Sequence, residues 1–153
     1  MKRLIAVALL GTLLLGVNAI AAGAVDGPWK RDVAKSKLSG AAPNSGTRAY
    51  TESKDGTTLD AKAIGADGKA ASMHVTLTHD GKAQPITGNP ATDGGTGKAI
   101  DAHTTGFTLS RGATVADTVH RAVSADGRTL TVHNAGTRPD GTTYDDTLVI
   151  DRQ

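Results

Sequence analysis

The sequence predicts an all-β fold, an antiparallel up-and-down β-barrel in which about 8–10 strands follow one another as a meander. The first observation is a series of Asp-Gly pairs. They suit tight hairpin turns because glycine has no Cβ and aspartate tolerates the left-handed conformation. The second observation is the alternation of apolar and polar residues beside these pairs, which is the period of a strand with one buried face. Five such pairs are Asp55-Gly56, Asp67-Gly68, Asp80-Gly81, Asp126-Gly127 and Asp140-Gly141.

Ten segments have the composition and spacing of strands. Along one of them, Val115, Val119 and Val123 recur on a single face. The connection at 33–47 is long and could hold a helical turn, and the connection at 87–97 is rich in glycine, which is typical of a loop. The expected strands are 28–32, 48–53, 57–64, 70–79, 82–86, 99–103, 106–111, 114–124, 128–134 and 142–151.

The register of three hairpins follows from matching their apolar faces. Two-residue turns at Asp80-Gly81 and Asp126-Gly127 keep apolar side chains opposite one another. Asp67-Gly68 instead requires a three-residue loop in which the glycine supplies the left-handed residue of a bulge. The resulting apolar pairs are Val75 with Ile86, Val123 with Leu130, and Met73 with Ala61.

A meander of this length leaves two exposed sheet edges unless the sheet closes on itself. Closure gives a barrel whose interior can hold one small ligand. A flat sheet or a β-sandwich is the alternative architecture. A sandwich usually needs longer crossover connections, and only two connections here are long.

Residues 1–24 are predicted to be a secretory signal peptide. A basic start at Lys2 and Arg3 precedes an apolar run at 4–15, and Ala22-Gly23-Ala24 fits the cleavage pattern. A single membrane span is the alternative interpretation, but the apolar run is short and no basic cluster follows it. We therefore expect one mature domain at 25–153, secreted or periplasmic, with no membrane span.

The charge of this expected mature domain is balanced. The leader holds 2 of the 17 Lys and Arg residues and none of the 15 Asp and Glu residues, so 17 − 2 = 15 basic residues face 15 acidic ones. No basic run remains to bind phosphates, and we expect no nucleic-acid partner. The chain has no cysteine, which excludes disulfides and lipid attachment at an N-terminal cysteine. With few aromatic residues the core must be thin, which favours a sheet closed on itself.

The segment Gly27-Pro28-Trp29 follows the predicted leader directly and contains the single tryptophan. This Gly-x-Trp, taken with the strand count, resembles the first strand of the lipocalins and fatty-acid-binding proteins, the calycin barrels. The resemblance implies a lipocalin-like barrel whose tryptophan plugs one end and whose interior binds a small, partly hydrophobic ligand. The last strand departs from the Arg-x-Tyr carboxylate clamp of fatty-acid-binding proteins, because it carries Tyr144-Asp145-Asp146. That departure argues against a fatty-acid head-group site of the same kind.

A second resemblance covers nearly the whole expected mature chain. The segments 27–37, 85–90 and 124–131 and the ending 148–153 are similar to a family of small exported bacterial proteins. This resemblance implies export but no activity.

Candidate ligand-binding residues are those expected to face the barrel interior. Asp117 and Arg121 interrupt an apolar face, as Asp146 does on the last strand, and such charges must pair or contact water. They could form the polar floor of a ligand pocket, with Arg121 meeting an anionic group. Alternatively, they form a buried structural network or lie where strand ends splay into solvent. The predicted ligand-binding residues are Tyr50, Met73, Val75, Leu77, Phe107, Val119, Arg121, Tyr144 and Asp146.

No catalytic residue, cofactor or metal ligand is predicted. His120 falls opposite His133 on the polar face, but zinc needs three or four ligands in fixed geometry. No nucleophile elbow, phosphate-binding loop or His-Glu-x-x-His motif occurs. The leading hypothesis is a ligand-binding barrel, and an envelope or extracellular interaction module without a cavity is the alternative. An enzyme that uses the pocket is a third. A filled interior would exclude the first.

Overall fold

The computed structural model describes residues 23–41, 43–87 and 91–153, so the predicted leader lies almost wholly outside the described residues. The described residues form ten strands, and they include no helix that could cross a membrane. The strands are β1 (Gly27–Lys37), β2 (Ser45–Glu52), β3 (Gly56–Ile64), β4 (Ala70–Thr78), β5 (Gln84–Pro85), β6 (Gly94–Ala99), β7 (Thr104–Arg111), β8 (Thr114–Val123), β9 (Thr129–Thr137) and β10 (Thr143–Arg152).

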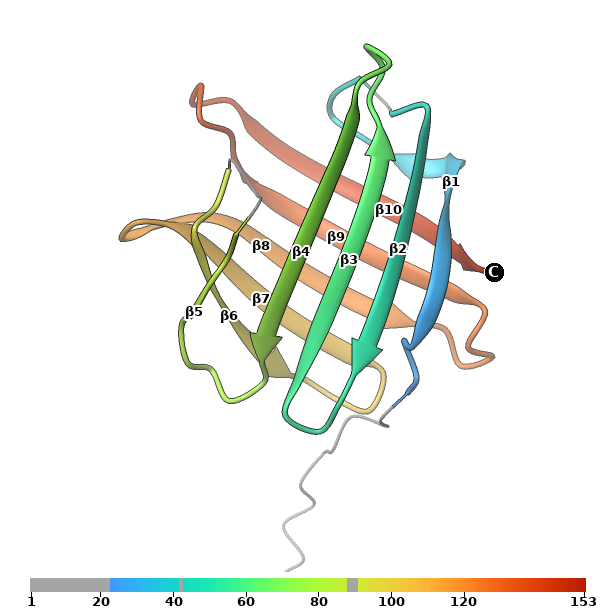
Figure 1. Cartoon of the computed structure of the whole chain (residues 1–153), viewed down its shortest axis with the longest axis vertical. Coiled ribbons are helices and arrows are strands. Elements are labelled where there is room, and N and C mark those ends of the chain that lie inside the picture. The colour runs from blue at the N-terminus through green and yellow to red at the C-terminus, as the bar shows by residue number, and fades with distance from the viewer. Residues whose placement is uncertain (1–22, 42, 88–90) are drawn as a thin grey trace, which may run out of the picture.

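All ten strands belong to one antiparallel sheet in the order β4-β3-β2-β1-β10-β9-β8-β7-β6-β5. Strands β1 to β4 cross in front of β7 to β10, so the sheet wraps around an interior (Figure 1). Among the described residues, two isolated bridges join its two edges, His74 to Thr87 and Asp80 to Lys98. The predicted all-β meander is therefore confirmed as a nearly closed barrel.

The two edges of the sheet approach each other at glycines, which have no side chain. Gly94–Ala99 forms strand β6, so the prediction of a glycine-rich loop at 87–97 and a strand at 99–103 is wrong there. A Cβ on Gly97 would lie 2.6 Å from the carbonyl oxygen of Thr78, which shows how closely β6 approaches β4. Glycine here permits close backbone contact at the seam rather than a loop.

The register at Asp67-Gly68 and at Asp126-Gly127 is confirmed. Met73 pairs with Ala61, and Val123 pairs with Leu130. Gly68 has a φ of +79° and closes the expected three-residue loop. At Asp126-Gly127 the turn is longer than the predicted two residues. The last hydrogen bond between the strands runs from Ser124 N–H to the carbonyl of Thr129, and the residues between these two form the loop.

At Asp80-Gly81 the expected two-residue hairpin is wrong. The single bridge between His74 and Thr87 fits the expected register, but β5 pairs with β6 rather than along β4. Gly81 instead donates its N–H to the carbonyl of Gly97.

The connection expected at 33–47 is shorter than predicted and contains no helical turn among its described residues. Strand β1 continues to Lys37, with a register shift between Asp32 and Lys37 against β10. At this irregularity Ser36 Oγ donates to the carbonyl of Asp32 and accepts from the N–H of Val149. Pairing with β10 resumes at Lys37.

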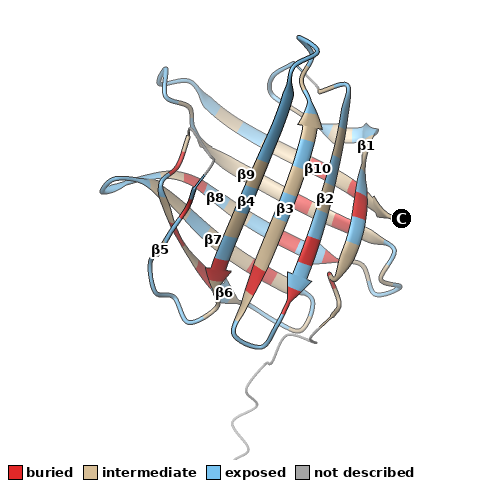
Figure 2. Cartoon of the chain, in the orientation of Figure 1, coloured by how far each residue is buried: buried red, intermediate tan, exposed pale blue. Residues whose placement is uncertain are grey.

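The compact core surrounds Trp29, which is fully buried. Its indole Nε1–H donates to the carbonyl of Val25 at 2.7 Å, and the Arg152 guanidinium lies 4.3 Å from the ring centroid. Arg152 also donates to the carbonyls of Ala24 and Asp26, so the segment before β1 is tied across this end of the barrel. Buried residues gather towards this end, whereas the β3–β4 hairpin is exposed (Figure 2).

A β-bulge in β8 changes the face on which Val115 lies. Leu109 pairs with Asp117, but Ser110 pairs with Val115, which leaves Ala116 as the extra residue. Val115 is 58% exposed, so the prediction that it shares the interior face with Val119 is wrong. Asp117 and Arg121 keep the inward direction.

Candidate functional site: a polar-lined cavity in the barrel

The barrel encloses a cavity of about 180 Å³ between the two sets of crossing strands. Seven of the nine predicted ligand-binding residues line it: Tyr50, Met73, Val75, Leu77, Phe107, Val119 and Arg121. The other lining residues are Arg48, Thr57, Leu59, Leu109, Asp117, Val132 and Asn134. Its wall is thus mostly aliphatic and aromatic with a few polar groups, which is the usual composition of a small-molecule site.

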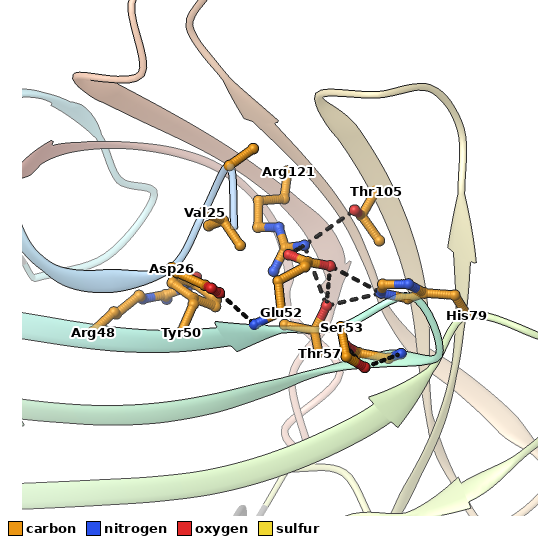
Figure 3. Close-up of polar contacts among 12 residues, drawn as sticks. Val25, Asp26, Arg48, Tyr50, Glu52, Ser53, Thr57, His79, Thr105 and Arg121 are labelled. Carbon is orange, nitrogen blue, oxygen red and sulfur yellow. Dashed lines mark hydrogen bonds and ion pairs between the residues drawn. The ribbon is translucent and has the colours of Figure 1, made fainter. Parts of the chain in front are cut away.

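A buried ion pair forms one end of this cavity. Arg121 Nη2 donates to Glu52 Oε2 at 2.7 Å and to Thr105 Oγ1 at 3.0 Å (Figure 3). Both charged side chains are almost completely buried. They come from β8 and from the end of β2, so the pair ties the two sides of the barrel together.

Thr57 and His79 complete this polar cluster. Thr57 Oγ1 donates to Glu52 Oε1 at 2.7 Å and lies 2.8 Å from His79 Nε2. Because the threonine hydroxyl has one proton, His79 must carry a proton on Nε2 and donate it. Burial lowers the pKa of His79, and Glu52 only partly opposes this, so the imidazole is neutral at physiological pH.

Arg121 also packs between aromatic rings. Its guanidinium carbon lies 5.0 Å from the centroid of Tyr50 and 5.3 Å from that of Phe107. Its Nη1 is buried and has no hydrogen-bond partner among the described residues. Arg121 therefore belongs both to a structural network and to the cavity wall. Its charge is already balanced by Glu52, which does not favour the predicted role of binding a ligand anion.

Asp117 is a second buried charged group in the wall. Burial raises its pKa to about 6, although a hydrogen bond from the Tyr144 hydroxyl opposes the rise. Its Oδ1 and the Oδ1 of Asn134 are buried without partners among the described residues. The three residues that carry these unpartnered atoms, Asp117, Asn134 and Arg121, all line the same cavity.

Gly136 allows Tyr144 to reach Asp117. It pairs with Asp117 on one side and with Tyr144 on the other. A Cβ on Gly136 would collide with the Ala116 carbonyl oxygen at the bulge and would lie 2.9 Å from the Tyr144 hydroxyl.

We expect Gly136→Ala to destabilise the fold by about 1–3 kcal/mol, because the backbone of β8 and the Tyr144 ring must both move. The free energy of unfolding in urea measures this effect. Gly106→Ala is the matched control, since its Cβ would meet only the flexible end of Ile100 at 3.2 Å. An equal loss in the two variants would contradict the close packing at Gly136.

The pKa of Asp117 also predicts a pH dependence of stability. Its native pKa of about 6 lies above its ordinary value of 3.8, so the native state holds this proton more tightly than the unfolded state. Stability is therefore highest below pH 4 as far as this group is concerned, and up to about 3 kcal/mol is lost as the pH rises from about 4 to about 6. We expect Asp117→Asn to remove that loss. The difference in unfolding free energy between wild type and variant, measured from pH 4 to pH 7, should change with pH, and a constant difference would contradict the raised pKa.

The remaining two predicted ligand-binding residues do not line the cavity. Tyr144 supports Asp117 and packs under the Arg138 guanidinium at 4.8 Å. Asp146 accepts hydrogen bonds from the backbone N–H and the hydroxyl of Ser39, outside the cavity. No residue of β10 is among those that line this cavity.

The histidines of the outer face lie apart from this site. His120 lies opposite His133 in the register of β8 and β9. His133 Nε2 is hydrogen-bonded to Asp145, and His74 is hydrogen-bonded to Asp60. Among the described residues no three His, Cys, Asp or Glu side chains are grouped to hold a metal ion.

The sequence interpretation omitted Glu52, Arg48 and Asn134 from the site. Glu52 is the only glutamate in the chain, and it stands at an inward position two residues after Tyr50. The period-two alternation of the strand could therefore have placed Glu52 on the same face as Tyr50. Asn134 could have been found in the same way, since it lies opposite Val119 in the register that the hairpin predicts.

Ten antiparallel meander strands, a nearly closed barrel and an interior cavity define a barrel of the calycin type. Among solved structures, zebrafish ileal bile acid-binding protein in complex with cholic acid has a similar fold, with a TM-score of 0.54 and 11% sequence identity. The similarity covers 85% of this chain and 99% of that one. No family model and no curated protein matches the sequence, so the resemblance to exported bacterial proteins finds no support.

Proposed function

We propose that this protein is an exported, non-enzymatic barrel that binds a small, partly hydrophobic ligand in its interior. The observation that carries the proposal is the hollow interior, whose wall includes three residues with a buried, unpartnered polar atom: Asp117, Arg121 and Asn134. Buried polar groups are normally hydrogen-bonded, because leaving one unpaired costs about 1–3 kcal/mol. A ligand with donor and acceptor groups would satisfy them.

The dimensions of the cavity support a compact ligand. An apolar cavity of roughly 150 Å³ is enough to hold a benzene-sized molecule. The cavity here has about 180 Å³, and a second hollow of about 230 Å³ shares Arg48 and Met73 with it. A ring system or a short chain can fill the first space and extend into the second. The similar zebrafish protein, which was solved with cholic acid, supports an interior ligand of this general kind.

Export is the second part of the proposal. It is supported by the basic start, the apolar run and the Ala22-Gly23-Ala24 pattern of the first 24 residues. Mass spectrometry of the protein from the culture medium or periplasm would show cleavage near Ala24, and a full-length cytoplasmic product would contradict it.

We expect Val119→Trp to abolish interior binding, because the indole would occupy the cavity from the middle of β8. The neutral fluorophore N-phenyl-1-naphthylamine is a suitable probe, and its fluorescence titration gives the affinity. Val115→Trp is the matched control on the same strand, because Val115 faces solvent. Probe binding that survives Val119→Trp, or that wild type lacks altogether, would contradict the proposal.

A further inference from the structure

A hollow with an unbalanced charge lies between the cavity and the β3–β4 hairpin. Its basic lining residues are Arg31, Arg48 and Lys62, and no acidic residue lines it. The remaining lining residues are small or apolar, or carry hydroxyls: Gly46, Thr47, Ala61, Ala63, Ala71, Ser72, Met73 and Ile150. A ligand group that lies in this hollow therefore meets positive charge and an otherwise weakly polar wall.

Arg31 and Arg48 enter this hollow from the adjacent strands β1 and β2. Arg31 lies over Gly46, where an added Cβ would come within 3.4 Å of its guanidinium carbon. The Nε of Arg31 is buried without a hydrogen-bond partner among the described residues. Arg48 donates to the Tyr50 hydroxyl at 3.1 Å and lines both hollows.

Neither guanidinium forms an ion pair with the described residues, whereas Arg121 is paired with Glu52. Asp146 attracts Arg31 electrostatically but is held by Ser39 and does not line the hollow. Burial and the neighbouring charge of Arg48 both lower the pKa of Arg31. Two half-buried like charges on adjacent strands repel each other, and an anion between them would relieve the repulsion.

We propose that Arg31 and Arg48 form an oxyanion-binding site at the β3–β4 end of the barrel. The ligand of the proposed function, on which this inference rests, is then an amphipathic organic anion. Its apolar body occupies the cavity beside Val119, and its single carboxylate or sulfonate lies between the two guanidiniums. Arginine suits this role because its planar group donates two parallel hydrogen bonds to an oxyanion. Arg121, neutralised by Glu52, contributes only a hydrogen bond at the inner end.

A matched pair of probes tests the head-group site. The sulfonated fluorophore 8-anilino-1-naphthalenesulfonate has the hydrocarbon body of N-phenyl-1-naphthylamine plus one anionic group. We expect wild type to bind the sulfonated probe more tightly, and added NaCl to weaken only that probe. In the variant with both Arg31→Gln and Arg48→Gln, affinity for the sulfonated probe should fall tenfold or more, and much further than affinity for the neutral probe, on which Arg48 acts only as part of the cavity wall.

Arg128→Gln is the control for loss of positive charge elsewhere, since it removes one positive charge at the β8–β9 hairpin, outside both hollows. It should leave both affinities unchanged. An unchanged affinity of the double variant for the sulfonated probe, or an equal loss for both probes, would overturn the head-group site while leaving interior binding intact. If neither probe binds wild type, the proposed function itself fails and the head-group site fails with it. Thermal unfolding without probe separates folding defects from binding, because removing both repelling charges should not destabilise the apo protein.

Discussion

Replacing Glu52 by alanine is expected to destabilise the protein by about 3–5 kcal/mol, because it leaves the Arg121 charge buried without its counter-ion. Arg121 is only 3% exposed and cannot turn towards water without leaving the interior. The substitution also removes the acceptor for Thr57 Oγ1. Since small domains are stabilised by only about 5–15 kcal/mol, a loss of this size would leave the fold marginal. Urea unfolding followed by circular dichroism measures it.

Two further variants separate charge from packing. Glu52→Gln keeps the shape and an acceptor oxygen, so its loss should be smaller than that of Glu52→Ala and should report mainly the missing charge. Adding Arg121→Met to Glu52→Ala removes both charges, and the double variant should be more stable than Glu52→Ala alone. If the loss of stability in the double variant equals the sum of the losses in Glu52→Ala and Arg121→Met, the two side chains are not coupled.

The strands were predictable because their evidence is local. Alternation and Asp-Gly turns place Val123 opposite Leu130 and Met73 opposite Ala61 without any knowledge of the distant chain. The errors arise where distant strands meet. Gly97 belongs to a strand because its backbone must approach Thr78, and a search for loops among glycine-rich segments cannot detect that contact.

The site was predictable on its apolar side and not on its polar side. Val119 and Leu77 face inward by period alone. The partner of Arg121 is Glu52, which is separated from it by 69 positions, and only closure of the barrel brings them together. Val115 was misplaced because the bulge at Ala116 resets the period of β8, and bulges leave no distinctive residue type in this segment.

Replacing Trp29 by alanine is expected to lower the free energy of unfolding by about 3–5 kcal/mol, which is the range for large aromatic residues in cores. Trp29 is fully buried. Its indole donates a hydrogen bond to the carbonyl of Val25 and packs against the Arg152 guanidinium. Because it is the only tryptophan, circular dichroism rather than fluorescence must follow unfolding. Trp29→Phe keeps an aromatic ring for Arg152 but loses the hydrogen bond to Val25, so we expect a smaller loss of about 1–2 kcal/mol.

The consequence of Trp29→Ala should extend to ligand binding. Tyr50 and Val132 belong both to the core cluster around Trp29 and to the cavity wall. A void beside them lets the wall relax inward or admit water, and the affinity for N-phenyl-1-naphthylamine should fall together with stability. Trp29→Phe should retain most of that affinity. If Trp29→Ala loses less than about 1 kcal/mol and binds the probe as wild type does, Trp29 neither closes the barrel end nor supports the cavity, and its burial would reflect local packing alone.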